Sequence, residues 1–375
     1  MAEPCSRTTA NDEDLARYAA LLGQAEAVHG VSLWQDAWRR LRRNRPAMVA
    51  LAYLVVLAVI ASTAPGLPLQ SPYRVNSQIS LAVPVAPAIL AHGIHVLDAQ
   101  GRLSGARLKA ELEDLGPLGS ALFRLRLKVF GERTLSSVCG TDELGRDVLA
   151  RLVWGSRVSL MAGLVATAVS LVIGVSYGAV AGYAGGRIDN LMMRVVDILY
   201  SVPLIFIVIF LVTFLSEPAV KERLDRVGID RQTVFYLVVG AVYWLTMARV
   251  VRGQVVSLKH EPFIDAARSI GAGRARIVFR HLVPNLMSVV IVYLTLTIPQ
   301  VMLFEAFLSF LGLGVQAPHV SWGLLANQGF RVITPLKVYW WLIVFPGMAL
   351  GMTLFALNFL GDGLRDALDP RLKHR

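Results

Sequence analysis

The chain has 375 residues, 55% of them hydrophobic, and a positive mean hydropathy. One soluble core would not bury this much apolar surface, and the apolar residues are bunched in runs, so the composition indicates an integral membrane protein. The formal net charge of +11 does not indicate a nucleic-acid partner, because the arginines cluster beside apolar runs, where they orient spans and meet anionic lipid headgroups.

The first 45 residues are predicted to be a cytoplasmic tail that approaches the membrane surface. Trp34 and Trp38 precede five arginines between positions 39 and 45, a pattern typical of an amphipathic interfacial segment. Residues 46–64 then provide nineteen residues without a charge. This run is long enough to span a bilayer, and the polar tail before it is too extended for a signal peptide. We predict an uncleaved first transmembrane helix with its N terminus inside.

Residues 65–156 are predicted to be a long extracytoplasmic loop. They carry ten Lys or Arg against eight Asp or Glu, and no apolar run long enough to cross. A loop of this length escapes the positive-inside rule, so its charge does not argue against an outside location. His92 and His95 have a metal-like spacing, but without a third ligand a surface loop is favoured and no metal site is expected. Cys5 and Cys139 then lie on opposite sides of the membrane and form no disulfide framework.

The end of this loop is rich in groups that can cap helices or pair. Thr141 or Asp142 can cap a short helix. Pairable charges at the outer interface are supplied by Arg146, Asp147, Arg151 and Arg157. The expected role of these residues is structural.

The second span is predicted from Val158 to about Ala181. Gly174, Gly178 and Gly182 follow one another at intervals of four and form a small-residue ridge that suits close helix packing. A crowded helix bundle is therefore expected.

The third span is predicted from about Val195 to Leu215. Asp197 lies near its start, where solvation or pairing with Arg194 is favoured over a functional role. Pro203 is expected to kink the helix. Residues 216–232 hold four acids and four bases and are expected to be a solvated connector.

The fourth span, about residues 233–251, leads into a basic segment with seven Lys or Arg against two acids between positions 249 and 280. This excess places the segment in the cytoplasm. Pro262 suits a first helical turn, and Gly271 occupies a position where a left-handed residue is needed, so a helix, a tight turn and a second helix are predicted. Pro284 is expected to end the second helix. Ala267 and Gly271 lie on one face, and because both are small, another backbone or side chain can approach this face closely.

The spacing Asp265-Ala266-Ala267, Gly271, His281 to Pro284 resembles the EAA loop of the membrane subunits of bacterial ABC importers. The family pattern has Glu, Ile and Leu where this chain has Asp265, His281 and Val283. In that family the loop docks as a coupling helix in a cleft of the ATPase subunit, which implies a coupling loop at residues 252–285. The coupling residues implied are Glu261, Asp265, Ala266, Ala267, Arg268, Gly271, Arg276, Arg280, His281 and Pro284.

The fifth span is predicted from about Leu286 to Phe304 and the sixth from about Tyr339 to Leu360. Glu305 is a candidate for lining a substrate path or pairing helices, and pairing is favoured. Trp322 fits an interfacial anchor.

Further segments resemble the dipeptide, oligopeptide and nickel branch of these permeases. They are the GTDxxGRDV segment at residues 140–148, the run from Glu305 to Gly314, Ser321-Trp322-Gly323, and the ending at residues 361–372. The outer-interface motif comprises Gly140, Thr141, Asp142, Gly145, Arg146, Asp147 and Arg157. In this family a kink such as that at Pro203 shapes the pathway wall, so Asp197, Pro203 and Glu305 are the pathway or helix-pairing candidates.

The sequence thus predicts an all-α membrane protein with six transmembrane helices and both termini cytoplasmic. The resemblance implies the type I permease fold, with a core at residues 157–361 and a tail at 362–375. It also implies the bacterial inner membrane, a second homologous permease, two ATP-binding subunits and an extracytoplasmic substrate-binding protein. Membrane lipid surrounds such a chain, and a nucleic-acid partner is not expected.

No catalytic site is expected in this chain. It has no Gly-Lys dipeptide, so it lacks a phosphate loop, and no cofactor is expected to bind; ATP is used by partner subunits. A secondary transporter remains an alternative, disfavoured because charges lie near span ends and no internal repeat is evident. A membrane-embedded enzyme is disfavoured because no catalytic constellation appears within the spans. Peptides, nickel complexes, peptide-like antibiotics and sugar-derived ligands all stay open as substrates.

Overall fold

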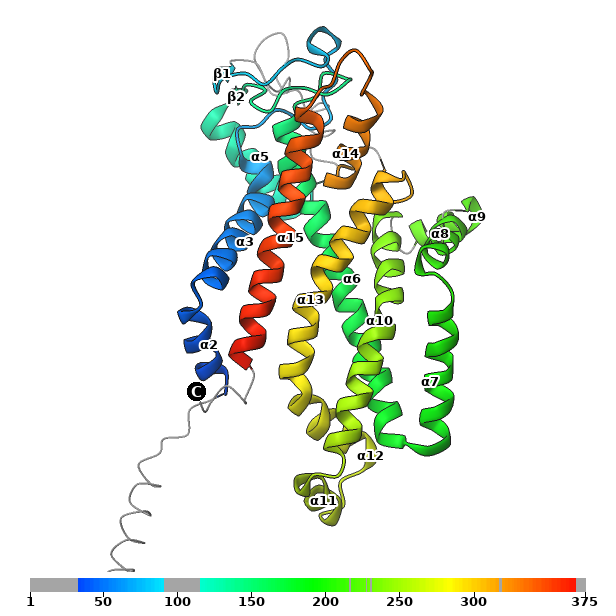
Figure 1. Ribbon diagram of the computed structural model, residues 1–375. Helices are drawn as coiled ribbons and strands as arrows, with labels where there is room; N and C mark the ends of the chain where they lie inside the picture. The colour runs from blue at the N-terminus through cyan, green and yellow to red at the C-terminus, as the bar shows by residue number, and fades with distance from the viewer. Residues whose placement is uncertain are drawn as a thin grey trace, which may run out of the picture.

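The computed structural model describes residues 33–90, 115–215, 217–226, 228–229, 231–316 and 319–368, and it is mostly helical (Figure 1). Long helices run side by side in one bundle, with a small layer of strands and loops at one end and a helical turn at the other. The bundle is formed by α2 (Leu33–Arg43), α3 (Arg45–Thr63), α6 (Val148–Ala184), α7 (Gly186–Ser201), α8 (Leu204–Leu215), α10 (Arg231–Leu258), α13 (Val283–Phe310) and α15 (Trp341–Leu368).

The remaining elements are short. The outer layer contains η1 (Ala64–Gly66), η2 (Ser77–Ile79), β1 (Ile89–Leu90), α5 (Pro117–Phe130) and β2 (Thr134–Leu135), and the other connections hold α9 (Pro218–Arg226), α11 (Pro262–Ser269), α12 (Arg274–Arg276), η3 (Ile277–Leu282) and α14 (Trp322–Arg331). Strands β1 and β2 pair antiparallel, with Ile89 opposite Leu135. The segment predicted as a loop at 65–156 therefore contains a helix and a two-stranded sheet.

Five helices among the described residues are long and apolar enough to cross a membrane. They are Arg45–Gly66, Val148–Ala184, Arg231–Leu258, Arg274–Phe310 and Trp341–Leu368. The pair α7 and α8 makes a sixth candidate, bent by 88° at its break. The first span begins one residue before the predicted start, because Asn44 caps α3 by accepting from the backbone N–H of Ala47 at 3.2 Å.

The ridge predicted on the second span is confirmed by close packing of α6 on α10. A Cβ on Gly174 would lie 2.6 Å from Met247 Cβ, and one on Gly182 would lie 2.8 Å from the Arg252 carbonyl oxygen. A Cβ on Gly178 would collide with the carbonyl oxygen of Ala248. Only glycine lets the two backbones approach this closely.

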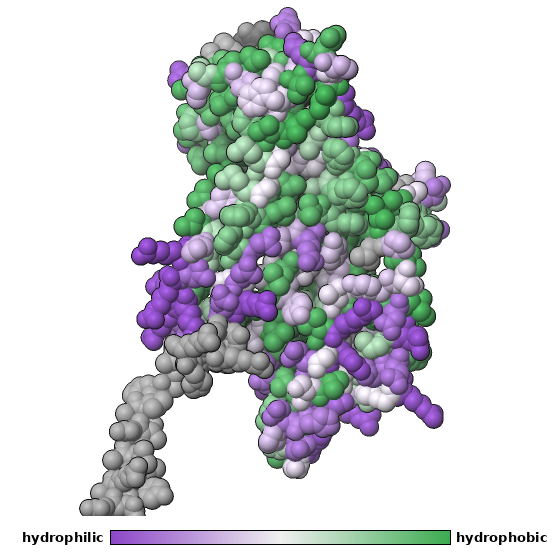
Figure 2. All heavy atoms as spheres, viewed as in Figure 1, coloured by the Kyte–Doolittle hydropathy of each residue, from purple (hydrophilic) through white to green (hydrophobic). Residues whose placement is uncertain are grey.

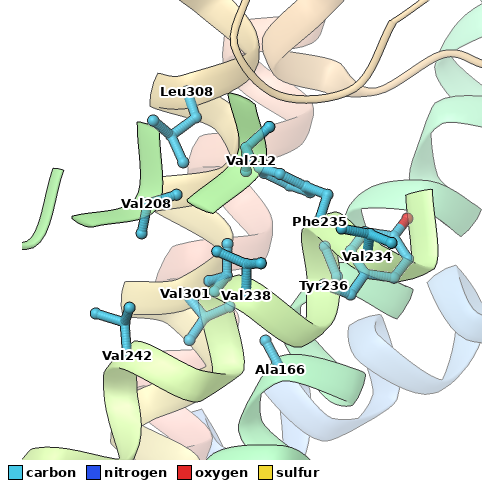
Figure 3. Close-up of a cluster of buried hydrophobic side chains, with 12 residues drawn as sticks. Ala166, Val208, Val212, Val234, Phe235, Tyr236, Val238, Val242, Val301 and Leu308 are labelled. Carbon is cyan, nitrogen blue, oxygen red and sulfur yellow. The ribbon is translucent and has the colours of Figure 1, made fainter. Parts of the chain in front are cut away.

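The outer half of the bundle closes around a β-branched core (Figure 3). Val208 and Val212 of α8 face Val238 and Val242 of α10, with Val301 of α13 between them. These side chains lose little rotamer freedom on packing because they are stiff at χ1. The core therefore ties α8 firmly to α10 and α13.

Helix α6 begins at Val148, ten residues before the predicted start of the second span. Arg151 and Arg157 had marked an interface, yet both lie within the helix. Arg151 is 1% exposed and pairs with Asp142, and the Arg157 guanidinium lies over the Trp154 ring at 5.1 Å. Because both arginines have partners, the first turns of α6 can contain these charges, although the sequence alone indicates a polar segment there.

The third span differs from the prediction in both its start and its shape. Helix α7 begins at Gly186, and the chain breaks completely at Val202 and Pro203 where only a kink was expected. Val202 is extended, with φ −88° and ψ 129°. Proline has no N–H to donate and forces the residue before it out of the helical region, so the helix ends there.

Three other segments are more helical than the predicted span ends indicate. The connector at 216–232 contains α9. Helix α15 continues to Leu368, eight residues beyond the predicted end of the sixth span, so the tail predicted at 362–375 begins inside a helix. Helix α13 runs past Phe304 to Phe310. In the extension of α13, Glu305 is buried and hydrogen-bonded, as shown below.

Candidate functional site

The segment between α10 and α13 folds as a helix closed by a Schellman turn. The N–H of Ala272 donates to the carbonyl of Ala267 at 3.0 Å, and the N–H of Gly271 donates to that of Arg268 at 2.9 Å. Gly271 has φ +82°, so the predicted left-handed conformation is confirmed. Pro262 occupies the first turn of α11 after Glu261, which is the exposed N-cap residue. The end of α11 is therefore fixed by backbone geometry.

The inner face of α11 packs on the chain itself. Ile264 is 0% exposed and joins Val255, Ile277, Leu282 and Leu286 in one apolar cluster. Ala267 is 4% exposed, so the close approach predicted at this small residue is made by the chain itself, whereas Gly271 is exposed. Ala266 is the exposed alanine of the pair.

The outward side of this segment exposes both apolar and basic side chains. Phe263 is 39%, Ile270 85% and Phe279 53% exposed. Asp265 pairs with Arg268 at 3.0 Å, and the Arg268 guanidinium lies 5.9 Å from the Tyr183 ring. Exposed charge is also provided by Arg274, Arg276 and Arg280. We call these residues, from Phe263 to Arg280, the α11 surface.

The second helix does not end at Pro284 as predicted. The chain is helical from Arg274 to Phe310, and Pro284 is in the first turn of α13. The turn before it, η3, is a π-helix in which the N–H of Val283 donates to Val278. The wider turn moves the carbonyl of residue 280 away from the proline ring, so the helix continues. His281 is half-buried here, and its carbonyl accepts from Asn285 at 2.7 Å.

Two polar contacts tie this segment to the α6–α7 turn. Lys259 donates to the Gly182 carbonyl at 3.0 Å. Arg252 forms a bidentate pair with Asp189, with its Nη2 at 2.6 Å from Oδ2. The sequence analysis used Arg252 and Lys259 only as positive charges that place the segment in the cytoplasm. The pair between Asp189 and Arg252 could not be predicted, because the two residues are 63 positions apart. These contacts make the α11 surface continuous with the bundle.

The outer-interface motif forms a buried charge cluster. The Asp142 carboxylate accepts from the backbone N–H of Arg146 at 2.9 Å, from Arg146 Nε at 2.7 Å and from Arg151 Nη1. Gln328 accepts from Arg151 at 2.8 Å and so brings in α14. The predicted cap is corrected: Asp147, not Thr141 or Asp142, caps a helix, accepting from Leu149 at 3.1 Å at the start of α6.

The two motif glycines allow the strand-like loop to approach other backbones. Gly140 has φ +78° and Gly145 has φ +69°. A Cβ on Gly140 would lie 2.7 Å from the Ala82 carbonyl oxygen, and one on Gly145 would collide with that of Asn76. The Thr141 carbonyl accepts from Trp341 at 3.2 Å. The motif therefore joins residues 76–82 to α6 and α15.

Burial sets the proton affinity of two groups in this cluster. Burial raises the pKa of Asp147 from 3.8 to about 7, although backbone N–H groups of Leu149 and Ala150 oppose the shift. Burial and then the Asp147 charge raise the pKa of Cys139 to about 11, so this thiol stays protonated. Cys5, His92 and His95 lie outside the described residues. Among those that are described, no three His, Cys, Asp or Glu side chains form a metal-like group.

The pathway or pairing candidates lie in separate settings. Asp197 is 58% exposed, in agreement with the predicted solvation, and it pairs with Arg249 of α10 at 2.8 Å rather than with Arg194. Pro203 marks the break between α7 and α8. Glu305 is 0% exposed and accepts from Ser159 at 3.3 Å and from Ser309 at 2.7 Å. This geometry favours the predicted helix-pairing role for Glu305.

Comparison with known proteins places the chain in a family. Residues 151–374 match the family of binding-protein-dependent transport system inner membrane components, and residues 32–84 match the N-terminal TM domain of oligopeptide transport permease C. The dipeptide transport system permease protein DppC of Bacillus subtilis is 38% identical over 93% of this chain and 90% of its own. The oligopeptide transport system permease proteins OppC of Haemophilus influenzae and Salmonella typhimurium are 37% and 39% identical, over 92% and 96% of this chain and 90% and 97% of theirs. On this evidence the chain belongs to the family of binding-protein-dependent transport system inner membrane components.

Proposed function

We propose that this chain is one of two homologous permease subunits in an importer driven by two ATP-binding subunits and supplied by an extracytoplasmic binding protein. Its cargo is peptides or related small solutes. The named relatives, which are dipeptide and oligopeptide permeases covered over at least 90% of their length, support this cargo class. Family membership makes the chain a multi-pass inner-membrane permease component, and it implies ATPase and substrate-binding partners.

Peptide transport is tested by uptake. Cells that carry the complete transporter should accumulate labelled di- and oligopeptides, and deletion of this chain should abolish that uptake. Competition with unlabelled peptides of different lengths would define the preferred size. Accumulation of nickel without any accumulation of peptide would contradict the proposed cargo.

The observation that carries the coupling role is the α11 surface. Phe263, Ile270 and Phe279 expose apolar area that the described part of the chain does not cover, and Gly271 closes the helix that carries Phe263. Exposed large apolar side chains together with arginines are typical of a protein-docking site. We assign it to the ATPase subunit, and the same assignment gives roles to Glu261, Asp265, Ala266, Arg268, Arg276, Arg280 and His281 at its edges.

An exposed apolar residue provides the sharpest test of docking. Ile270→Arg should leave the chain folded, because the side chain is 85% exposed. It should lower co-purification of the ATPase subunits at least tenfold, because an arginine would be buried unpaired in the interface. The control is Leu336→Arg, at a leucine that is 97% exposed in the loop before α15. Normal ATPase association in Ile270→Arg would contradict the proposal.

We propose six spans with both termini in the cytoplasm, in the type I permease fold, counting α7 and α8 as one broken span. Reporters fused after Gln100 should lie outside, and those fused after Lys259 or Arg375 should lie inside. An inside signal at Gln100 would contradict this topology.

The chain is proposed to bind no cofactor and to leave ATP to its partners, because it has no phosphate loop. The purified permease should show no ATP hydrolysis. Activity that is lost on substitution of residues in this chain would contradict the assignment.

A further inference from the structure

An open apolar groove runs between α3 and α15, away from the α11 surface. It has a volume of about 800 Å³ and is lined from Arg45 to Tyr53 on one helix and from Gly351 to Phe359 on the other. Val49 is 71%, Phe355 66% and Met352 51% exposed. The Tyr53 hydroxyl and Thr353 Oγ1, 3.1 Å apart, hold the two helices together beside it. The groove is thus formed by the α3–α15 pair itself.

Positive charge gathers at one end of this groove. Arg45 lines it at the N-terminal end of α3, and α2, which leads into α3, carries further arginines. Between Leu33 and Arg45 and between Gly361 and Leu368 there are six arginines and three aspartates. Figure 2 shows hydrophilic side chains gathered around α2, below the more apolar surface of α3 and α15.

Arg40 pairs with Asp36 at 2.8 Å, whereas the other arginines of α2 and Arg45 are exposed to solvent. Arg39, Arg42, Arg43 and Arg45 are exposed. In the described part of the chain no carboxylate pairs with Arg45, and Arg42 lies over the Trp38 ring at 5.1 Å. A tryptophan that is 44% exposed beside arginines is typical of the headgroup region of a bilayer.

We propose that this groove holds an acyl chain of an anionic phospholipid whose phosphate is bound by Arg45 and the arginines of α2. The apolar groove matches the acyl chain, and the arginines at its end match the phosphate, in the order that the two have along the bilayer normal. The net positive charge favours an anionic headgroup over a zwitterionic one. A polypeptide helix in the groove would have to bring its own carboxylates to pair with the exposed arginines, whereas a lipid phosphate already carries the negative charge.

Gly351 lines the groove and offers a position from which a larger side chain would fill it. An added Cβ on Gly351 meets no atom within 4 Å, so Gly351→Leu places a side chain in the groove without displacing α15. Gly347, one turn earlier on the same helix, is equally open but does not line the groove. Gly347→Leu is therefore a matched control. For charge, Arg45→Gln is matched by Arg187→Gln, an exposed arginine at the start of α7.

The test is native mass spectrometry of the complete purified transporter titrated with phosphatidylglycerol or phosphatidylcholine. The unmodified complex should retain phosphatidylglycerol in preference to phosphatidylcholine. Arg45→Gln should weaken that retention roughly fivefold, as expected for one basic residue at an anionic surface. Gly351→Leu should abolish it, whereas Gly347→Leu and Arg187→Gln should retain it. Equal retention of both lipids, or retention unchanged in Gly351→Leu, would overturn the proposal.

A crosslinking arm identifies the occupant directly. Benzoylphenylalanine in place of Phe355, activated in cells that carry the complete transporter, should give a lipid adduct on this chain. An adduct to another polypeptide would overturn the proposal in favour of a helix–helix interface. Peptide uptake is not the readout in either arm, so failure here is distinguishable from failure of the proposed transport function.

Discussion

Arg252 donates two hydrogen bonds to Asp189, from Nε to Oδ1 at 3.0 Å and from Nη2 to Oδ2 at 2.6 Å. Asp189 lies in the first turn of α7, and Arg252 lies in α10 shortly before the chain enters α11. The pair therefore connects the α6–α7 turn to the helix that carries the α11 surface. Movement of α11 at this end of the bundle would be passed to α7 through it.

Breaking this pair should loosen the inner end of the bundle. Asp189→Ala and Arg252→Ala should each lower the free energy of unfolding, by roughly 1 to 3 kcal/mol, since each removes hydrogen bonds between charged groups. The Arg252 side chain is 39% exposed, which places the effect toward the lower end. The double variant should lose less than the sum of the two, measured by unfolding of the purified chain in mixed detergent. Full additivity would show that the two residues are not coupled.

Substitution at Gly271 should distort the α11 surface without affecting membrane insertion. At φ +82°, a β-branched side chain costs about 1 to 3 kcal/mol of backbone strain, although an added Cβ meets no atom within 4 Å. Gly271→Val should therefore show normal abundance, weaker ATPase association and little or no peptide uptake. The control is Gly273→Val, two residues on, where φ −67° and ψ 157° suit any residue. Unchanged uptake in Gly271→Val would show that the turn is only a connector.

Glu305 should matter for stability through its volume and its two acceptor oxygens. Ser159 and Ser309, which donate to Glu305, themselves accept from the backbone N–H groups of Trp322 and Val315. Glu305→Ala should cost roughly 2 to 5 kcal/mol of unfolding free energy, because it leaves a cavity and unpaired hydroxyls. Glu305→Gln retains the shape and should cost much less. Equal losses in both variants would contradict this account.

Asp147 should make the stability of the outer cluster depend on pH. Its pKa rises from 3.8 to about 7 on folding, so between these values the folded chain binds more protons than the unfolded chain. Stability therefore falls as pH rises through this window. The Cys139 thiol stays protonated up to about pH 11 and does not contribute.

The check is the Tm of the purified chain between pH 4 and pH 8. Asp147→Asn keeps a capping oxygen and removes the titration, so its Tm should fall less over this range than that of the unmodified chain. Glu143→Gln removes an exposed neighbouring carboxylate and should leave the slope unchanged. A slope that persists in Asp147→Asn would assign the pH dependence to another group.

The sequence by itself determined the features that depend on neighbouring residues. The uncharged run after Arg45, the glycine ridge of α6 and the positive φ at Gly271 were all predicted correctly. Each follows from local physics: desolvation of a continuous apolar helix, the volume of a side chain at a close approach, and the steric cost of a Cβ in the left-handed region.

Only the tertiary structure decided how charges within or near the spans are neutralised. In the sequence, Arg151 indicated a membrane interface, but in the structure it is buried against Asp142 and Gln328. Asp197 likewise pairs with Arg249 rather than with the nearby Arg194. The energy of a buried charge depends on what lies opposite it, and that residue comes from another part of the chain. The positions of the helix ends depend on these distant partners, so they could not be read from local hydropathy.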